Sequence, residues 1–209
     1  MIIKADFEQG IIKKDVGRVY LDPVTELAWI PIPKCGSNSM MTIMKKLNNG
    51  KPWPMRNTLI EPEWNKFKRL IILRDPVTRW RAGMGETLMI VDRHGGTMHT
   101  VRNYTHTHNM YSGLTNRHIA TQISLCHGVD TDNAIFIKLE DFNEKIGLFF
   151  PLKFPVPHIR RWQDNEKKKD IITFVDQMLA KEETLEKIHE AYKQDFELID
   201  YLERNNRFV

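Results

Sequence analysis

The segment Ile30-Pro31-Ile32-Pro33-Lys34-Cys35-Gly36-Ser37-Asn38-Ser39 joins a predicted strand to a predicted helix. Residues 26–32 before it are apolar and bulky, and residues 37–48 after it carry apolar side chains at helical spacing. A helix N-terminus presents unpaired N–H groups and a positive dipole end, Gly36 lets an anion approach the backbone, and Lys34 adds a full charge. The segment therefore predicts an anion-binding loop. The alternative is a capped helix beside a surface lysine, and the order differs from a Walker A loop because Lys34 precedes the glycine.

Strands alternate with helices on both sides of this loop. Residues 17–33 are typical of a hairpin, with Asp22-Pro23-Val24-Thr25 as its turn. Further strands are expected at 69–73 and 134–139, and helices at 37–48, from Pro76 onward, and at 115–126, 168–180 and 183–203. Residues 51–66, 91–112 and 151–165 are expected to be loops. The order predicts an α/β fold, namely a single P-loop-like domain over 1–209 with a mainly parallel sheet and helices on both faces.

Composition narrows the protein class. The 209 residues are 41% hydrophobic and 28% charged, and 31 basic against 27 acidic residues give a net charge of +4. This is ordinary globular composition, and so mild an excess does not by itself indicate nucleic acid. Two cysteines favour a reducing compartment, and no apolar run approaches the ~20 residues of a membrane span. Because the first residues also lack a signal peptide's apolar stretch, a cytoplasmic protein is expected.

A second charged motif follows the next predicted strand. Leu73-Arg74-Asp75-Pro76-Val77-Thr78-Arg79-Trp80 places Arg74 at the strand's carboxyl end, where open α/β sheets bind ligands. A guanidinium binds phosphate through two parallel hydrogen bonds. The alternative is a structural ion pair between Arg74 and a neighbouring carboxylate.

Together the two motifs resemble those of the sulfotransferases that use 3′-phosphoadenosine-5′-phosphosulfate (PAPS), most closely the carbohydrate sulfotransferases. Pro33 to Ser39 is similar to the family's 5′-phosphosulfate loop, and Arg-Asp-Pro-x-x-Arg at 74–79 to its 3′-phosphate motif. Three weaker likenesses follow in the family's order: Gln122-Ile123-Ser124-Leu125-Cys126, Phe136-Ile137-Lys138-Leu139-Glu140-Asp141-Phe142, and Tyr192-Lys193-Gln194-Asp195-Phe196-Glu197-Leu198-Ile199-Asp200-Tyr201.

The resemblance implies transfer of a sulfuryl group from PAPS to a hydroxyl or amine, with carbohydrate as the family-weighted acceptor. Lys34 would be catalytic by neutralising the leaving oxygen, without any metal. The residues expected to bind the 5′ end are Lys34, Cys35, Gly36, Ser37, Asn38 and Ser39, and Arg74 would bind the 3′-phosphate. Ala82 stands where the family's 3′-phosphate motif usually has a serine, so one hydroxyl contact is missing.

A catalytic base and a cover for the nucleotide are also expected. Glu61, then Glu63, in the 51–66 loop are the first candidates for the base, with His108 as runner-up. Arg160 and Arg161, beside Trp162, are candidates to cover the nucleotide by charge and stacking. Each of these residues has the simpler alternative of a solvated surface group.

Two other functions stay open at this stage. One is a non-catalytic nucleotide- or glycan-binding module of the same fold. The missing hydroxyl at Ala82 and the lack of an assigned catalytic base are compatible with it. The other is a P-loop-type small-molecule kinase, which calls for a lysine after the last glycine and a pair of Mg²⁺ ligands.

Overall fold

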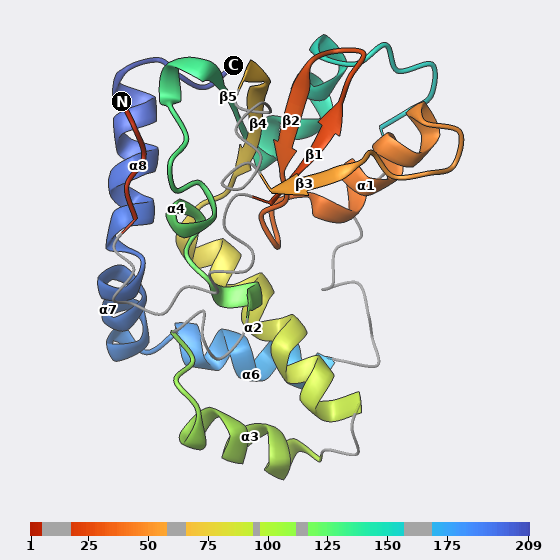
Figure 1. Ribbon diagram of the computed structural model, residues 1–209. Coiled ribbons are helices and arrows are strands. Elements are labelled where there is room, and N and C mark those ends of the chain that lie inside the picture. Colours follow the sequence, from red (N-terminus) through yellow and green to blue (C-terminus); the bar gives the residue numbers. More distant parts are fainter. Residues whose placement is uncertain (6–17, 58–65, 94–96, 112–116, 157–168) are drawn as a thin grey trace.

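A computed structural model describes residues 1–5, 18–57, 66–93, 97–111, 117–156 and 169–209 (Figure 1). Its strands are β1 Arg18–Asp22, β2 Leu27–Ile30, β3 Met55–Asn57, β4 Lys68–Leu73 and β5 Ala134–Lys138. Its α-helices are α1 Ser37–Leu47, α2 Pro76–Arg93, α3 Met98–Thr107, α4 Gln122–Leu125, α5 Phe142–Lys145, α6 Lys169–Leu179, α7 Glu182–Ala191 and α8 Lys193–Arg204. The fold is α/β, as the sequence predicts.

The five strands form one mixed sheet in the order β3-β1-β2-β4-β5. β2, β4 and β5 run parallel, with Trp29 opposite Leu70 and Ile71 opposite Phe136. β1 pairs antiparallel with both β2 and β3. The prediction of a mainly parallel sheet is therefore wrong. The predicted hairpin exists and forms part of this sheet, and β3 extends the antiparallel side from a segment expected to be a loop.

Both faces of the central strands are covered. All four residues of β2 are buried, and so are residues 69–73 of β4. Alternate residues of a strand point to opposite faces, so this burial requires cover on each side. Figure 1 shows α1 on one side of the strands and α4 and α8 on the other. The core cluster around the sheet includes Met40, Ile43 and Met44 from α1 and Leu198 and Leu202 from α8.

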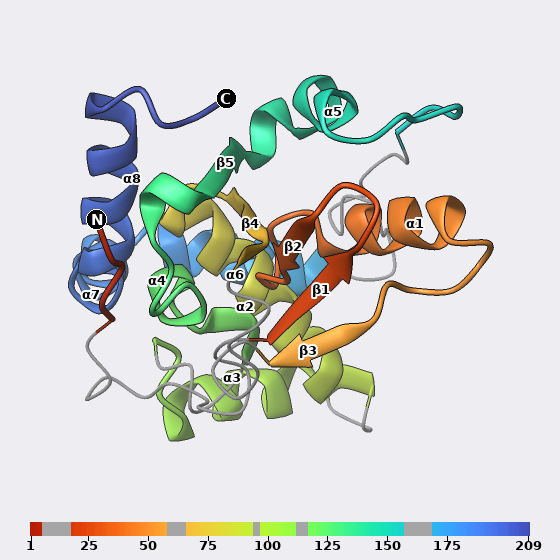
Figure 2. The same ribbon diagram turned by 45° about the horizontal axis from the view of Figure 1, so that its top comes forward.

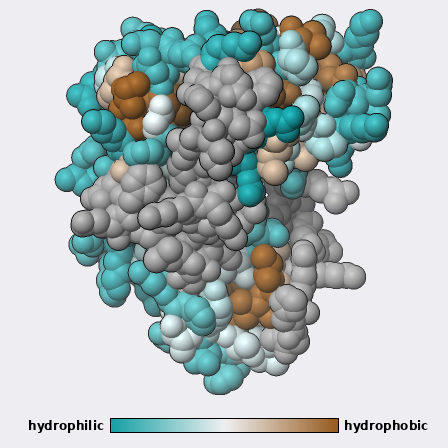
Figure 3. All heavy atoms as spheres, viewed as in Figure 1, coloured by the Kyte–Doolittle hydropathy of each residue, from teal (hydrophilic) through white to brown (hydrophobic). Residues whose placement is uncertain are grey.

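A second apolar cluster lies among the helices. Buried side chains of α2, α3, α6 and α7 meet there: Trp80, Met84, Leu88, Met89, Val101, Ile171, Val175 and Ile188. Figure 1 shows α2, α3 and α6 below the strands, with α2 leading from the sheet toward α3 and α6, and Figures 1 and 2 both show α7 below α8. Within the described residues, no helix is long and apolar enough to cross a membrane. The coloured part of the face in Figure 3 is mostly hydrophilic, with a few separate apolar patches.

Three further expectations are corrected. The stretch 91–112, expected as a loop, contains the ten-residue helix α3, which begins at a capping box between Thr97 and Thr100. The single helix expected at 183–203 is two helices, α7 and α8, which meet at Tyr192. The helix expected at 115–126 is a 3₁₀ turn, Arg117–Ile119, followed by the single turn α4.

Candidate anion-binding site

The loop between β2 and α1 is tightly folded. Lys34 and Gly36 adopt left-handed φ angles of 68° and 74°. The Cys35 N–H donates to the Ile32 carbonyl at 3.2 Å, and the Ser37 hydroxyl donates to the same carbonyl at 2.7 Å. A Cβ at Gly36 would lie 3.1 Å from Cδ1 of Leu139, the residue that follows β5. Glycine is thus favoured at this position both by its φ angle and by the close neighbour.

Gln122 joins this loop to the segment after β4. Its Oε1 accepts from Cys35 Sγ at 3.2 Å and from the Arg74 N–H at 2.9 Å. Its Nε2 donates to the Arg74 carbonyl at 2.7 Å. One buried amide therefore holds the two motifs side by side, although 39 residues separate Lys34 from Arg74 in the sequence.

Asp195 at the start of α8 holds Gln122 in turn. Its two carboxylate oxygens accept from the backbone N–H groups of Gln122 at 2.8 Å and Ile123 at 2.7 Å, which caps α4. The hydroxyl of Tyr192 donates to the Ile119 carbonyl just before this turn. The five segments that carry the sulfotransferase resemblance thus lie near one another, because Leu139 is so close to Gly36 that an added Cβ would lie 3.1 Å from it.

Arg79, on the first turn of α2, lies beneath the loop. Its side chain is 0% exposed, and its Nε donates to the Pro33 carbonyl at 3.1 Å. Its Nη1 and Nη2 are buried without a hydrogen-bond partner, as is Nε of Arg74. Buried donors are nearly always paired in proteins, so these guanidinium groups mark a place where a ligand or ordered water is expected.

Lys34 completes the positive cluster and faces a carboxylate. Its Nζ lies 3.3 Å from Oε2 of Glu86 on α2, and the two side chains are 19% and 29% exposed. Burial lowers the pKa of Lys34, and the charges of Arg79 and Arg74 lower it further, whereas Glu86 opposes the shift. Three cationic side chains therefore lie near one another at this loop, and the carboxylate of Glu86 offsets part of their charge.

The remaining predicted ligands of the donor differ in accessibility. Asn38 is exposed, Ser37 is partly buried, and Ser39 and Ala82 are buried. The thiol of Cys35 faces the core, where burial raises its pKa to about 12, so this residue can offer a ligand only its backbone. Glu61, Glu63, Arg160 and Arg161 lie outside the described residues.

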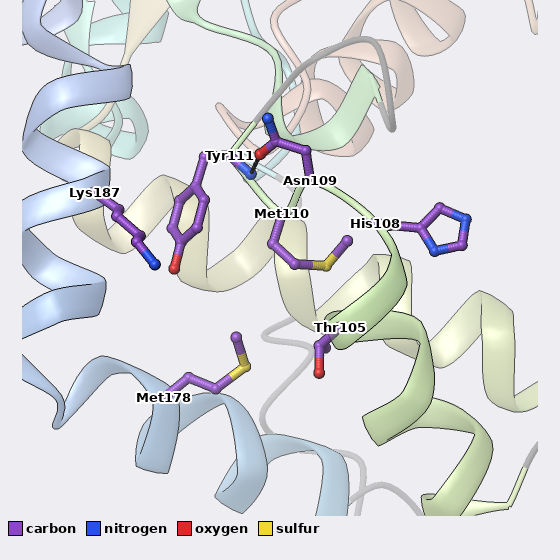
Figure 4. A pocket seen from close by; sticks show the side chains of 7 residues that line it. All are labelled: Thr105, His108, Asn109, Met110, Tyr111, Met178 and Lys187. Atoms are coloured by element: carbon purple, nitrogen blue, oxygen red, sulfur yellow. Dashed lines mark hydrogen bonds between the residues drawn. The ribbon is translucent and has the colours of Figure 1, made fainter.

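His108 follows α3 and lines a pocket of about 390 Å³ (Figure 4). Its ring stacks on Tyr104 at 4.0 Å, and Figure 4 shows it turned away from Tyr111 and Lys187. The pocket lining comes from the α3 end, α6 and α7: Thr105, His108, Asn109, Met110, Tyr111, Met178 and Lys187. Lys34 and Arg74 are not part of this lining, so the structure does not bring His108 together with them.

The structure adds four residues to the site that the sequence alone did not single out: Arg79, Glu86, Gln122 and Asp195. Arg79, Gln122 and Asp195 lie inside the motifs that resemble the sulfotransferases, so the sequence contained a signal that could have identified them. Glu86 lies outside every motif and 52 residues from Lys34, and only the path of α2 brings it to the loop. Among the described residues, no cluster of His, Cys, Asp or Glu is arranged to hold a metal ion.

Comparisons with protein-family models, with curated proteins and with solved structures find no match to this chain.

Proposed function

We propose that this protein is a sulfotransferase that takes its sulfuryl group from PAPS. The observation that carries the proposal is the convergence at Gln122. This side chain bonds both the loop of Lys34 and the backbone of Arg74, and the cationic groups of Lys34, Arg74 and Arg79 gather beside it. A donor with phosphate groups at both its 5′ and 3′ ends suits two neighbouring positive positions of this kind.

The roles follow from chemistry. The N–H groups at the start of α1 and the side chain of Lys34 would bind the 5′-phosphosulfate, and Arg74 the 3′-phosphate. In the reaction, the acceptor oxygen or nitrogen forms a bond to sulfur while the bond between sulfur and the bridging oxygen breaks. The electron pair stays on the 5′-phosphate of adenosine 3′,5′-bisphosphate, where Lys34 offsets the new charge.

The acceptor and the base remain predictions from the resemblance. A carbohydrate hydroxyl or amine is the expected acceptor, and its proton is expected to pass to Glu61 or Glu63. Variants Glu61→Gln and Glu63→Gln test this, because loss of a general base costs about 10²–10⁴-fold in rate while donor affinity stays intact.

A thermal-shift comparison of adenosine 3′,5′-bisphosphate with ATP and GTP tests the donor site. A ligand that binds only the folded state at 100 times its Kd adds about 2.7 kcal/mol of stability. The bisphosphate should raise the melting temperature by several degrees, and more than either triphosphate. A larger shift with ATP or GTP would overturn the proposal in favour of a kinase.

Lys34→Ala separates an enzyme from a binding module. We expect turnover to fall about 10²-fold, with a smaller change in donor affinity, because the charge of Lys34 is aimed at the leaving oxygen. Equal losses in both would make Lys34 a binding residue only. Donor binding without any turnover in the unaltered protein would support the binding module. The buried side chain of Ala82 favours this alternative, because it places a methyl where the family usually has a hydroxyl.

A further inference from the structure

Glu86 contacts Lys34, in the loop between β2 and α1, with its carboxylate. It shares one face of α2 with Arg79, since residues seven apart on a helix lie nearly above one another. Arg79 donates to the Pro33 carbonyl, and one residue further along the loop Lys34 meets Glu86 at 3.3 Å. Helix α2 therefore approaches the loop with a cation on its first turn and a carboxylate two turns later.

The carboxylate of Glu86 is paired with the ammonium group of Lys34, which is the cation that a bound anion would contact. Lys34 already has a negative partner in Glu86, and both side chains are more than two-thirds shielded from water. A 5′-phosphate that contacts Lys34 must either displace Glu86 or bind beside its negative charge. Both routes oppose binding, because separating a shielded pair and placing like charges together each raise the free energy.

Within the part of the chain that the structure describes, no carboxylate pairs with the Arg74 side chain that would bind the 3′ end of the nucleotide. Arg74 is fixed through its backbone by Gln122, and its Nε has no hydrogen-bond partner. The two ends of the proposed ligand thus meet cations in different states, one already paired and the other with an unpaired donor.

We infer that Glu86 acts as an internal competitor for the 5′ anion and lowers the affinity of every ligand that contacts Lys34. This inference rests on the proposed donor site, although it requires only anion binding and no sulfuryl transfer. Glu86 neutralises Lys34 through this ion pair. A ligand that is also anchored at Arg74 displaces it, and a ligand held at its 5′ end alone does so poorly.

Calorimetric titration with three defined nucleotides tests this inference. The ligands are adenosine 3′,5′-bisphosphate, 5′-AMP and 3′-AMP, and the proteins are the unaltered chain and Glu86→Gln. The variant should bind the bisphosphate and 5′-AMP about three- to tenfold more tightly, as expected for removing a partly exposed ionic competitor. Its affinity for 3′-AMP should not change, because that ligand does not require Lys34.

Two controls identify the partner of the carboxylate. Glu190→Gln removes the same charge from an exposed position on α7 and should change none of the affinities. In a Lys34→Ala background, Glu86→Gln should bring no gain, because the residue for which it competes is absent.

The possible failures are distinguishable. If the bisphosphate binds neither the unaltered chain nor Glu86→Gln, the proposed donor site itself is wrong, and this inference falls with it. If the bisphosphate binds the unaltered chain but Glu86→Gln gains nothing on 5′-AMP, or gains equally on 3′-AMP, only the role of Glu86 is wrong.

Discussion

Arg74 is held in place by its backbone, which leaves its side chain available for a ligand. Gln122 bonds both the N–H and the carbonyl of Arg74, and these bonds do not depend on the side chain. Arg74→Ala should therefore keep the loop in place and remove only the guanidinium. We expect affinity for adenosine 3′,5′-bisphosphate to fall at least tenfold and affinity for 5′-AMP to change little, as measured by calorimetry.

Arg81→Ala is a matched control for this experiment. Arg81 lies on the same helix and pairs with Asp176 of α6 at 2.5 Å, away from the loop. Its loss should cost no more than about 1 kcal/mol of stability and should leave both ligands unaffected. If Arg74→Ala weakens the two nucleotides equally, Arg74 does not bind the 3′-phosphate.

The lowered pKa of Lys34 gives the binding of anions a pH dependence. Burial, together with Arg79 and Arg74, makes Lys34 lose its proton at a lower pH than an ordinary lysine. An anion binds the protonated form, so binding takes up a proton and affinity should fall as pH rises from 7 to 10. The ligand contributes little to the change, since its phosphates are largely ionised above pH 7.

Lys34→Arg isolates this effect, because arginine stays charged over the whole range. Titrations of the variant at the same pH values should give a nearly constant affinity. An equal decline in both proteins would assign the pH dependence to another group.

Single residues also show which members of the candidate site the sequence predicts and which it does not. Lys34 and Arg74 were predicted because each follows a strand within a recognisable motif. Glu86 was not, since it belongs to no motif and reaches Lys34 only through the length and direction of α2. The importance of Arg79 depends on its complete burial, which the sequence does not show.

Among the elements, α2 is the one that connects the sheet to the helical cluster. It packs so closely on the 3₁₀ turn that a Cβ at Gly83 would lie 2.3 Å from the His118 carbonyl oxygen. The carbonyl oxygen of His118 belongs to the backbone, so it cannot move aside as the end of a flexible side chain could. Gly83→Ala should therefore cost roughly 1–3 kcal/mol. In a chain of this size that corresponds to a melting temperature about 3–10 °C lower by calorimetry.

Gly147→Ala is the comparison variant, because a Cβ there meets nothing within 4 Å. Its melting temperature should stay within about 2 °C of the unaltered protein, since surface substitutions of this kind usually have small effects. A tolerated Gly83→Ala would mean that α2 and the turn can separate without loss.

Elements with a strong periodic pattern were predicted well, and those formed by tertiary contacts were not. The apolar stripe of α1 predicted its buried face, and Met40, Ile43 and Met44 are all buried. Helix α3 buries only Val101 among its described residues, so its polar sequence carried little helical signal. Strand β3 has three residues and forms by pairing with β1, which no local pattern indicates.

At the scale of the whole molecule, the C-terminal helix supports a loop near the N-terminus. Asp195 caps α4, α4 begins with Gln122, and Gln122 bonds Cys35 and Arg74. The order of the motifs along the sequence resembles that of the sulfotransferase family, and it predicted that these segments belong to one domain. The hydrogen bonds that connect these segments form only in the folded protein. The sequence shows the residues that take part in them but not the bonds.

This connection predicts that Asp195→Asn harms both stability and ligand binding. Asp195 is 1% exposed, and both of its oxygens accept backbone N–H groups. An amide can accept only one of them and turns its own NH₂ toward the other. An unsatisfied buried donor costs about 1–3 kcal/mol, so the melting temperature should fall by several degrees. Because α4 would shift Gln122, affinity for adenosine 3′,5′-bisphosphate should also fall.

Asp200→Asn on the same helix is the control, since Asp200 is exposed and pairs with Arg204. It should change stability by no more than about 0.5 kcal/mol and leave the affinity intact. The two measurements on Asp195→Asn then separate two roles of α8. A lower melting temperature with unchanged affinity would restrict α8 to stabilising the fold. A fall in both, measured well below the melting temperature, would mean that the position of the loop depends on a helix about 160 residues further along the chain.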